Sequence, residues 1–220
     1  MIKKILVPVD FSAASAATLR YAESFAAFTR ATEVKVIHVF TPQVTTGDAL
    51  VILSMGELMD QRDEAFDTFL AENPAPKGLV RKSELLLGFA ADKIIRHSED
   101  FDLIIMSSTG DGDLLEQVFG NIASEVSQNA KCPVLLVPDQ AIFKEYNNVL
   151  YASNSLSLSR RAVLQFRGFN ELFHARVHFV HINDEEGQHE GKRESLFAPL
   201  LNNSDPEFAF ESPELSLIHN

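Results

Sequence analysis

The sequence predicts an α/β protein with an open, doubly wound parallel sheet of five strands, helices on both faces, and a partial second copy of this unit. Two observations predict this fold. Short apolar runs alternate with segments of helical periodicity five times within about the first 138 residues. The opening strand–turn–helix–strand pattern then returns near residue 149. Such alternation joins parallel strands through right-handed helical crossovers.

The first strand is expected at Ile5–Val9, a short run rich in Val and Ile. Asp10-Phe-Ser12 breaks this run, and Ser12 can cap the helix that follows. The remaining strands of the sheet are expected at Val34–Val39, Leu79–Leu87, Asp102–Met106 and Val134–Val137. Later helices are expected at about Val51–Glu72 and Phe89–Glu99, and along a face marked by Leu115, Val118, Phe119, Ile122 and Val126.

The repeat divides the chain into a first domain at residues 1–138, a linker at 139–146 and a partial second domain at 147–220. Val149–Ser153 repeats Ile5–Val9, and Asn154 takes the place of Asp10. A helix carrying Ala162, Val163, Phe166, Phe169 and Phe173 follows, then Val177–His181, a polar helix at about Glu185–Asn202 and a strand at Glu207–Glu211. No counterpart of the last strand–helix–strand follows, so we expect the second unit to lean on the first or on another chain.

Composition makes several partners unfavourable. The chain carries 19 basic and 31 acidic residues, a formal charge of −12, which opposes binding to nucleic acid or an anionic membrane. The single cysteine, Cys132, excludes a disulfide within the chain. No apolar run approaches the ~18 residues of a membrane span. We therefore expect a soluble, cytoplasmic protein.

Four segments resemble the universal stress protein family: ILVPVDFS at Ile5–Ser12, VIHVF at Val36–Phe40, LLLGFAADKIIRHSEDFDLIIMS at Leu85–Ser107 and GNIASEVSQNAKCPVLLVP at Gly120–Pro138. The last is the most specific. The resemblance implies the fold of the adenine-nucleotide α-hydrolase-like group and a regulatory role in stress response. The second half is similar to the start of another such domain, so the chain resembles a tandem member with an incomplete second domain.

The resemblance also implies a nucleotide site. Family members that bind ATP carry Gly-x2-Gly-x9-Gly-(Ser/Thr) after the fourth strand. Gly110 and Gly120 match this pattern, whereas Ser107 and Asn121 stand at the first glycine and the final hydroxyl. Asp10 and Val39 would flank the adenosine. The nucleotide-binding residues so implied are Pro8, Asp10, Val39, Ser107, Gly110, Gly112, Gly120, Asn121 and Ile122.

Acidic residues beside this motif predict weak binding. Asp111, Asp113 and Glu116 lie between Gly110 and Gly120. Each exposed carboxylate costs a bound phosphate about 1 kcal/mol. A divalent ion such as Mg²⁺ could reverse the effect by bridging carboxylate and phosphate. We expect weak binding of ATP, ADP or AMP, in an order that the sequence leaves open. The alternative is that Gly110, Gly112 and Gly120 serve only turns and packing, and that Asp10 only caps the first helix.

The sequence shows no recognisable arrangement of catalytic residues. No Ser, Cys or Lys nucleophile has a recognisable base beside it, and the histidines lack metal-site spacing. We therefore expect no catalytic residues, no metal site and an unidentified regulatory protein as partner. The alternatives are a ligand-free dimerisation module and, less favoured, a nucleotide α-phosphate hydrolase. The apolar strand Val134–Val137 further predicts a homodimer with Cys132–Pro138 at or near the contact.

Overall fold

The computed structural model describes residues 2–42, 55–108, 121–153, 160–181 and 208–209. By their internal contacts the residues form two compact units, 2–143 and 144–220. The first unit contains the candidate site.

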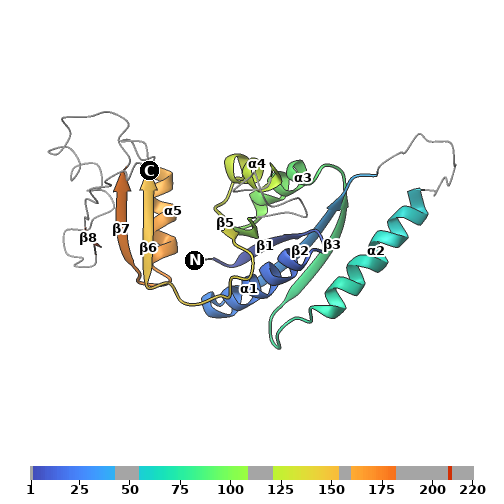
Figure 1. The fold of residues 1–220 in the computed structure, drawn as a ribbon, viewed down its shortest axis with the longest axis horizontal. Coiled ribbons are helices and arrows are strands. Elements are labelled where there is room, and N and C mark those ends of the chain that lie inside the picture. The colour runs from blue at the N-terminus through green and yellow to red at the C-terminus, as the bar shows by residue number, and fades with distance from the viewer. Residues whose placement is uncertain (1, 43–54, 109–120, 154–159, 182–207, 210–220) are drawn as a thin grey trace, which may run out of the picture. The chain divides into compact units, whose positions relative to one another are not determined.

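A five-stranded parallel sheet forms the centre of the first unit (Figure 1). Its strands are β1 (Lys4–Val9), β2 (Glu33–Phe40), β3 (Arg81–Leu87), β4 (Leu103–Ser107) and β5 (Val134–Val137), in the order β3-β2-β1-β4-β5. Every neighbouring pair is parallel. The predicted fold is therefore confirmed, and the strand order reverses between β1 and β4.

The helices also follow the predicted alternation. They are α1 (Ala13–Thr29), α2 (Met55–Glu72), α3 (Ala90–His97), which a 3₁₀ turn at Ser98–Asp100 extends, and α4 (Asn121–Asn129). Ser12 caps α1 as predicted, because its Oγ accepts the backbone N–H of Ser15 at 3.1 Å. Residues 51–54 of the second predicted helix, and Leu115, Val118 and Phe119 of the last, lie outside the described residues.

Both faces of the sheet carry buried apolar side chains. On one face Leu6 and Ile37 pack with residues of α3 and α4, which lie together on that side in Figure 1. Side chains alternate along a strand. Ile5, Val7 and Val36 therefore point to the other face, and all three are fully buried. Burial on both faces explains why these strands read as continuous apolar runs.

A buried polar cluster attaches α2 to α1 and β3. The guanidinium of Arg81 donates to Glu23 Oε1 at 3.0 Å and to the backbone carbonyls of Leu70 and Asn73 at the end of α2. Arg20 of α1 donates to Asn73 Oδ1 at 2.9 Å. Burial raises the pKa of the Glu23 carboxyl, although its bond to Arg81 acts in the opposite direction. The cluster fixes the end of α2 through hydrogen bonds, in addition to the burial of Phe66 and Phe69 on the same helix.

The second unit contains β6 (Asn148–Ser153), α5 (Arg160–Asn170), β7 (Arg176–His181) and β8 (Phe208–Ala209), with parallel strands in the order β6-β7-β8. Val149 lies opposite Val177 and Ser153 opposite His181, as Ile5 lies opposite Val34 and Val9 opposite His38. The strand register therefore repeats.

Parts of the second-copy prediction remain open. Phe173 was predicted on the helix, but α5 ends at Asn170, so Phe173 lies in the turn that follows. Asn154 and the predicted helix Glu185–Asn202 lie outside the described residues. That this unit is an incomplete second domain stays a prediction.

Candidate functional site

The candidate site lies at the carboxyl edge of the sheet, where the strand order reverses. Ile5 lies opposite Leu103 and Leu6 opposite Ile104, so parallel β1 and β4 end at the same edge. Asp10 directly follows β1, and Ser107 is the last residue of β4. In open α/β sheets, ligands bind beyond the strand ends at this kind of reversal.

Asp10 is exposed and supports the start of α1. Its Oδ1 accepts the backbone N–H of Ser12 at 3.0 Å and the hydroxyl of Ser12 at 2.6 Å. Ser12 in turn caps α1. Asp10 therefore holds the capping residue, and its exposed carboxylate can accept further bonds.

The apolar residues predicted for the adenosine side share one face of the sheet. Val39 packs against the cluster that contains Leu6 and Ile37. Pro8 lies two residues beyond Leu6 on β1 and therefore points to the same face. Ser107 instead follows Met106, which belongs to that cluster, so its side chain points to the opposite face.

The start of α4 is the described part of the predicted phosphate side. Asn121 and Ile122 are exposed in the first described turn of α4, which carries no acidic residue. The three glycines Gly110, Gly112 and Gly120, and the acidic residues Asp111, Asp113 and Glu116, lie outside the described residues. Their part in a phosphate site stays a prediction. Among the described residues, no group of three or more His, Cys, Asp and Glu side chains could hold a metal ion.

Sequence reasoning missed an aromatic contact beneath this edge. Phe11 adopts a left-handed backbone conformation, with φ of 67°. Its ring stacks on buried His38 with centroids 3.9 Å apart, and it also lies near Phe66 and Phe69 of α2. The His38 Nδ1 lies 2.8 Å from the carbonyl oxygen of Val9. An aromatic residue between the strand end and the capping serine is the sequence signal for this contact.

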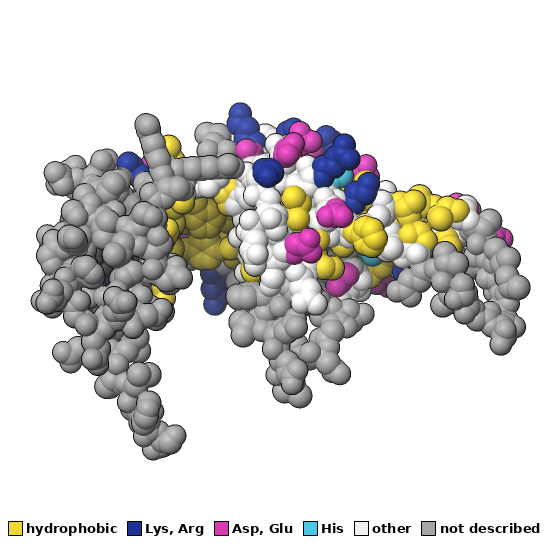
Figure 2. Space-filling model, turned by 90° about the horizontal axis from the view of Figure 1, so that it is seen from above, with side chains coloured by type: hydrophobic (Ala, Val, Ile, Leu, Met, Phe, Trp, Pro, Cys, Tyr) yellow, Lys and Arg dark blue, Asp and Glu magenta, His cyan; other side chains and the backbone are white. Residues whose placement is uncertain are grey.

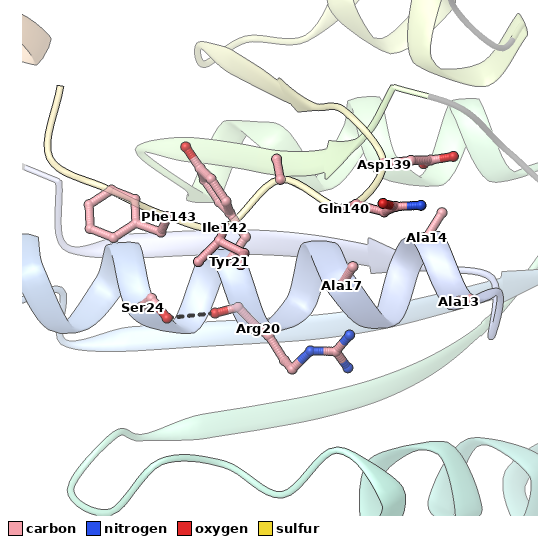
Figure 3. Close-up of a pocket in the computed structure, with 11 residues that line it drawn as sticks. Ala13, Ala14, Ala17, Arg20, Tyr21, Ser24, Asp139, Gln140, Ile142 and Phe143 are labelled. Carbon is pink, nitrogen blue, oxygen red and sulfur yellow. Dashed lines mark hydrogen bonds between the residues drawn. The ribbon is translucent and has the colours of Figure 1, made fainter.

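A separate hollow of about 610 Å³ lies between α1 and residues 139–143. Figure 3 shows Ala13, Ala14 and Ala17 on its helical side, while the guanidinium of Arg20 points away from residues 139–143. Phe143 closes one end by packing its ring near those of Tyr21, Phe25 and Phe28. The hollow is open and lined largely by small and apolar side chains.

The face of the first unit that carries α3 and α4 presents both signs of charge. Figure 2 shows lysine and arginine side chains interspersed with aspartate and glutamate there. Among the described residues of this face, such mixing gives no extended basic surface. Within the parts of the chain that the structure describes, no helix is long and apolar enough to cross a membrane.

Known proteins match most of the first unit. The model of the Universal stress protein family matches residues 1–138. Universal stress protein YxiE of Bacillus subtilis (strain 168) is 30% identical over 148 residues, which cover 62% of this chain and 99% of the relative. The solved structure of hypothetical protein MJ0577 is 27% identical and covers 64% of this chain and 99% of that chain, with a TM-score of 0.51. Universal stress protein MJ0577 comes from Methanocaldococcus jannaschii.

One solved structure extends over more of the chain. A universal stress protein from Archaeoglobus fulgidus DSM 4304 covers 94% of this chain and 75% of that chain, with a TM-score of 0.66. The two sequences are 17% identical, so this likeness concerns the fold alone.

Proposed function

This chain belongs to the universal stress protein family, and we propose that it is a regulatory member that binds an adenine nucleotide weakly without turning it over. The proposed seat is the crevice beyond the ends of β1 and β4. The observation that carries the proposal is the reversal of strand order between these two strands, with exposed Asp10 at the reversal.

The adenosine part is proposed to contact Pro8, Asp10 and Val39. Pro8 and Val39 offer apolar surface on one face of the sheet, next to the end of β1. The Asp10 carboxylate can accept a bond from a ribose hydroxyl while its Oδ1 holds Ser12.

The phosphate part is proposed to lie against the start of α4. Backbone N–H groups in the first turn of a helix attract anions, and the first described turn of α4, with Asn121 and Ile122, carries no acidic side chain. Ser107, Gly110, Gly112 and Gly120 are proposed to complete the seat. The carboxylates between Gly110 and Gly120 weaken it in the absence of a divalent ion.

Two measurements test this function. The purified protein is denatured and any released small molecule is identified, and calorimetry then follows titration with ATP, ADP and AMP, with and without Mg²⁺. We expect a released or added adenine nucleotide to bind with micromolar to millimolar affinity, and ATP to gain affinity with Mg²⁺. Absence of a released nucleotide, together with no heat of binding at millimolar nucleotide, would contradict the proposal.

We propose in addition that the protein forms a homodimer through β5, an edge strand of the sheet. The carbonyls of Pro133 and Val137 accept N–H groups from the β4 side. Because N–H and C=O direction alternates along a strand, the backbone groups of Val134 and Leu136 point to the open edge. A twofold copy could pair with them, and an unidentified regulatory protein could use the same edge. This edge also favours the second candidate function, a dimerisation module without ligand.

A further inference from the structure

We propose that His38 is a proton-operated latch: its neutral ring holds the Asp10–Ser12 turn and helix α2 against the sheet, and a protonated ring releases both. The latch is a property of the folded chain and does not depend on nucleotide binding. It rests on the position of the ring, on its hydrogen bonds and on the side chains stacked over it.

The hydrogen bonding of His38 fixes its tautomer. Its Nδ1 lies 2.8 Å from the carbonyl oxygen of Val9, and a carbonyl only accepts, so Nδ1 carries the proton. The other nitrogen, Nε2, is then a bare acceptor in the neutral ring. It is buried and has no hydrogen-bond partner among the described residues, and the residue is 7% exposed.

The side chains over the ring connect the crevice to α2. Phe11 stacks on His38 at 3.9 Å with an angle of 25° between the planes. The Phe11 ring lies 5.8 Å from Phe66 and 5.4 Å from Phe69, both on α2. Because Phe11 stands between Asp10 and Ser12, this stack joins the turn after β1 to α2.

Protonation is unfavourable while the stack is closed. A second N–H on the ring would be a buried donor without an acceptor, and its charge would lie in a desolvated site. Burial lowers the pKa of His38. The charged groups acting on the ring include Arg62 of α2, which also lowers the pKa, and Asp10 beyond β1, which raises it together with the Val9 carbonyl.

Opening relieves this cost. If Phe11 and α2 move away, water reaches Nε2 and the pKa of the ring returns towards its ordinary value of about 6.5. Above that pH the ring is neutral in both forms, so the closed form, with Phe11 and α2 packed over His38, keeps its full stability relative to the open form. As pH falls below it, the open form gains by up to about tenfold per pH unit, until the lower pKa of the closed form is reached.

Hydrogen exchange of the full chain tests the latch. Protection factors of α2, corrected for intrinsic exchange rates, are compared with those of α3 in the same sample between about pH 7.5 and pH 5. We expect the ratio of α2 to α3 protection to fall by up to about tenfold per pH unit below about pH 6.5. In the His38→Gln variant the ratio should stay constant with pH.

The matched control is His97→Gln. The Nδ1 of His97 also lies 2.8 Å from a backbone carbonyl, that of Lys93, but the side chain lies on α3 and is partly exposed. This variant should keep the pH dependence of the unmodified protein. The unmodified chain decides the question even if His38→Gln does not fold. A constant ratio, or an equal loss of protection in α2 and α3, would overturn the latch.

Discussion

At Phe11 the packing of the side chain offsets an unfavourable backbone conformation. A bulky side chain at φ of 67° is an unfavourable conformation that costs on the order of 1–3 kcal/mol. The stack on His38 and the contacts with Phe66 and Phe69 offset this cost. The turn after β1 is therefore held by the ring contacts of Phe11, while Asp10 stays exposed.

Two substitutions at Phe11 separate strain from packing. Phe11→Ala loses the ring contacts and keeps the strained backbone, whereas Phe11→Gly loses the contacts and removes the strain. We expect the Gly variant to be more stable than the Ala variant by about 1 kcal/mol, although both are less stable than the unmodified protein. Unfolding in urea measures the difference. If the Ala variant is the more stable of the two, the backbone at residue 11 is not strained.

The sequence predicted the polar half of this turn and missed the aromatic half. Ser12 as the cap of α1 follows from residue type and local position alone. The stack of Phe11 on His38 joins residues from two strand ends and requires a left-handed backbone that residue types do not specify. Long-range contacts of this kind depend on the folded chain, so the sequence offered only the aromatic residue itself.

At the scale of the elements, α2 depends on the Arg81 cluster. Phe66 and Phe69 are its buried residues, and Arg81 bonds to the carbonyls at its end and to Glu23. Arg81 and Glu23 are 13% and 4% exposed at their side chains. Removal of one partner would leave an uncompensated charge in a buried site.

We therefore predict that Arg81→Met lowers the free energy of unfolding by about 3 kcal/mol at neutral pH. The matched control is Lys82→Met, which removes an ion pair with Glu33 from the next residue of β3, where the lysine side chain is 60% exposed. That variant should lose less than about 1 kcal/mol. Urea unfolding compares the two variants. Equal losses would show that the buried Arg81 contributes no more to stability than the exposed ion pair of Lys82.

The loss in the free energy of unfolding caused by Arg81→Met, called the deficit below, should also depend on pH. Burial raises the pKa of Glu23, and loss of Arg81 raises it further. A carboxyl with a raised folded pKa favours the folded state at low pH, and this advantage disappears as pH rises through the folded pKa. The deficit should therefore shrink as pH falls towards about 4.5. A deficit that grows on acidification would contradict this assignment.

The edge strand β5 supplies the third prediction at this scale. Val134→Pro removes an N–H that points to the open edge, and the ladder with β4 stays intact. We expect a folded monomer by light scattering where the unmodified protein is a dimer. Leu135→Pro is the contrast, because its N–H points towards β4, and it should lower the free energy of unfolding. A Val134→Pro dimer as tight as the unmodified one would rule out pairing through β5.

At the scale of the whole molecule, the fold of the first unit could be predicted, whereas the packing of Phe143 against α1 could not. Five alternations and buried strands specified a parallel sheet, and β1 to β5 lie within a few residues of their expected positions. The family match ends at residue 138, but the compact unit extends to residue 143. The reason is Phe143, whose ring packs near Tyr21, Phe25 and Phe28.

This packing predicts a difference between two shortened chains. The free energy of unfolding should be about 2 kcal/mol higher for a chain that ends at Phe143 than for one that ends at Pro138. The reason is that the aromatic contact covers apolar surface of α1. Phe143→Ala in the longer chain should remove most of the gain. Thermal or urea unfolding measures the three proteins, and equal stability of the two chains would show that residues 139–143 do not belong to the unit.

The central claim, a nucleotide in the crevice beyond β1 and β4, is tested most directly by the ATP affinity of Ile122→Lys. Ile122 is 45% exposed at the start of α4, and a cation there should tighten ATP binding about fivefold. Val80→Lys adds the same charge just before β3, at the opposite edge of the sheet, where the valine is 55% exposed. We predict that calorimetry finds tighter binding for Ile122→Lys and unchanged binding for Val80→Lys. Equal affinities for the unmodified protein and both variants would place the nucleotide elsewhere and contradict the account.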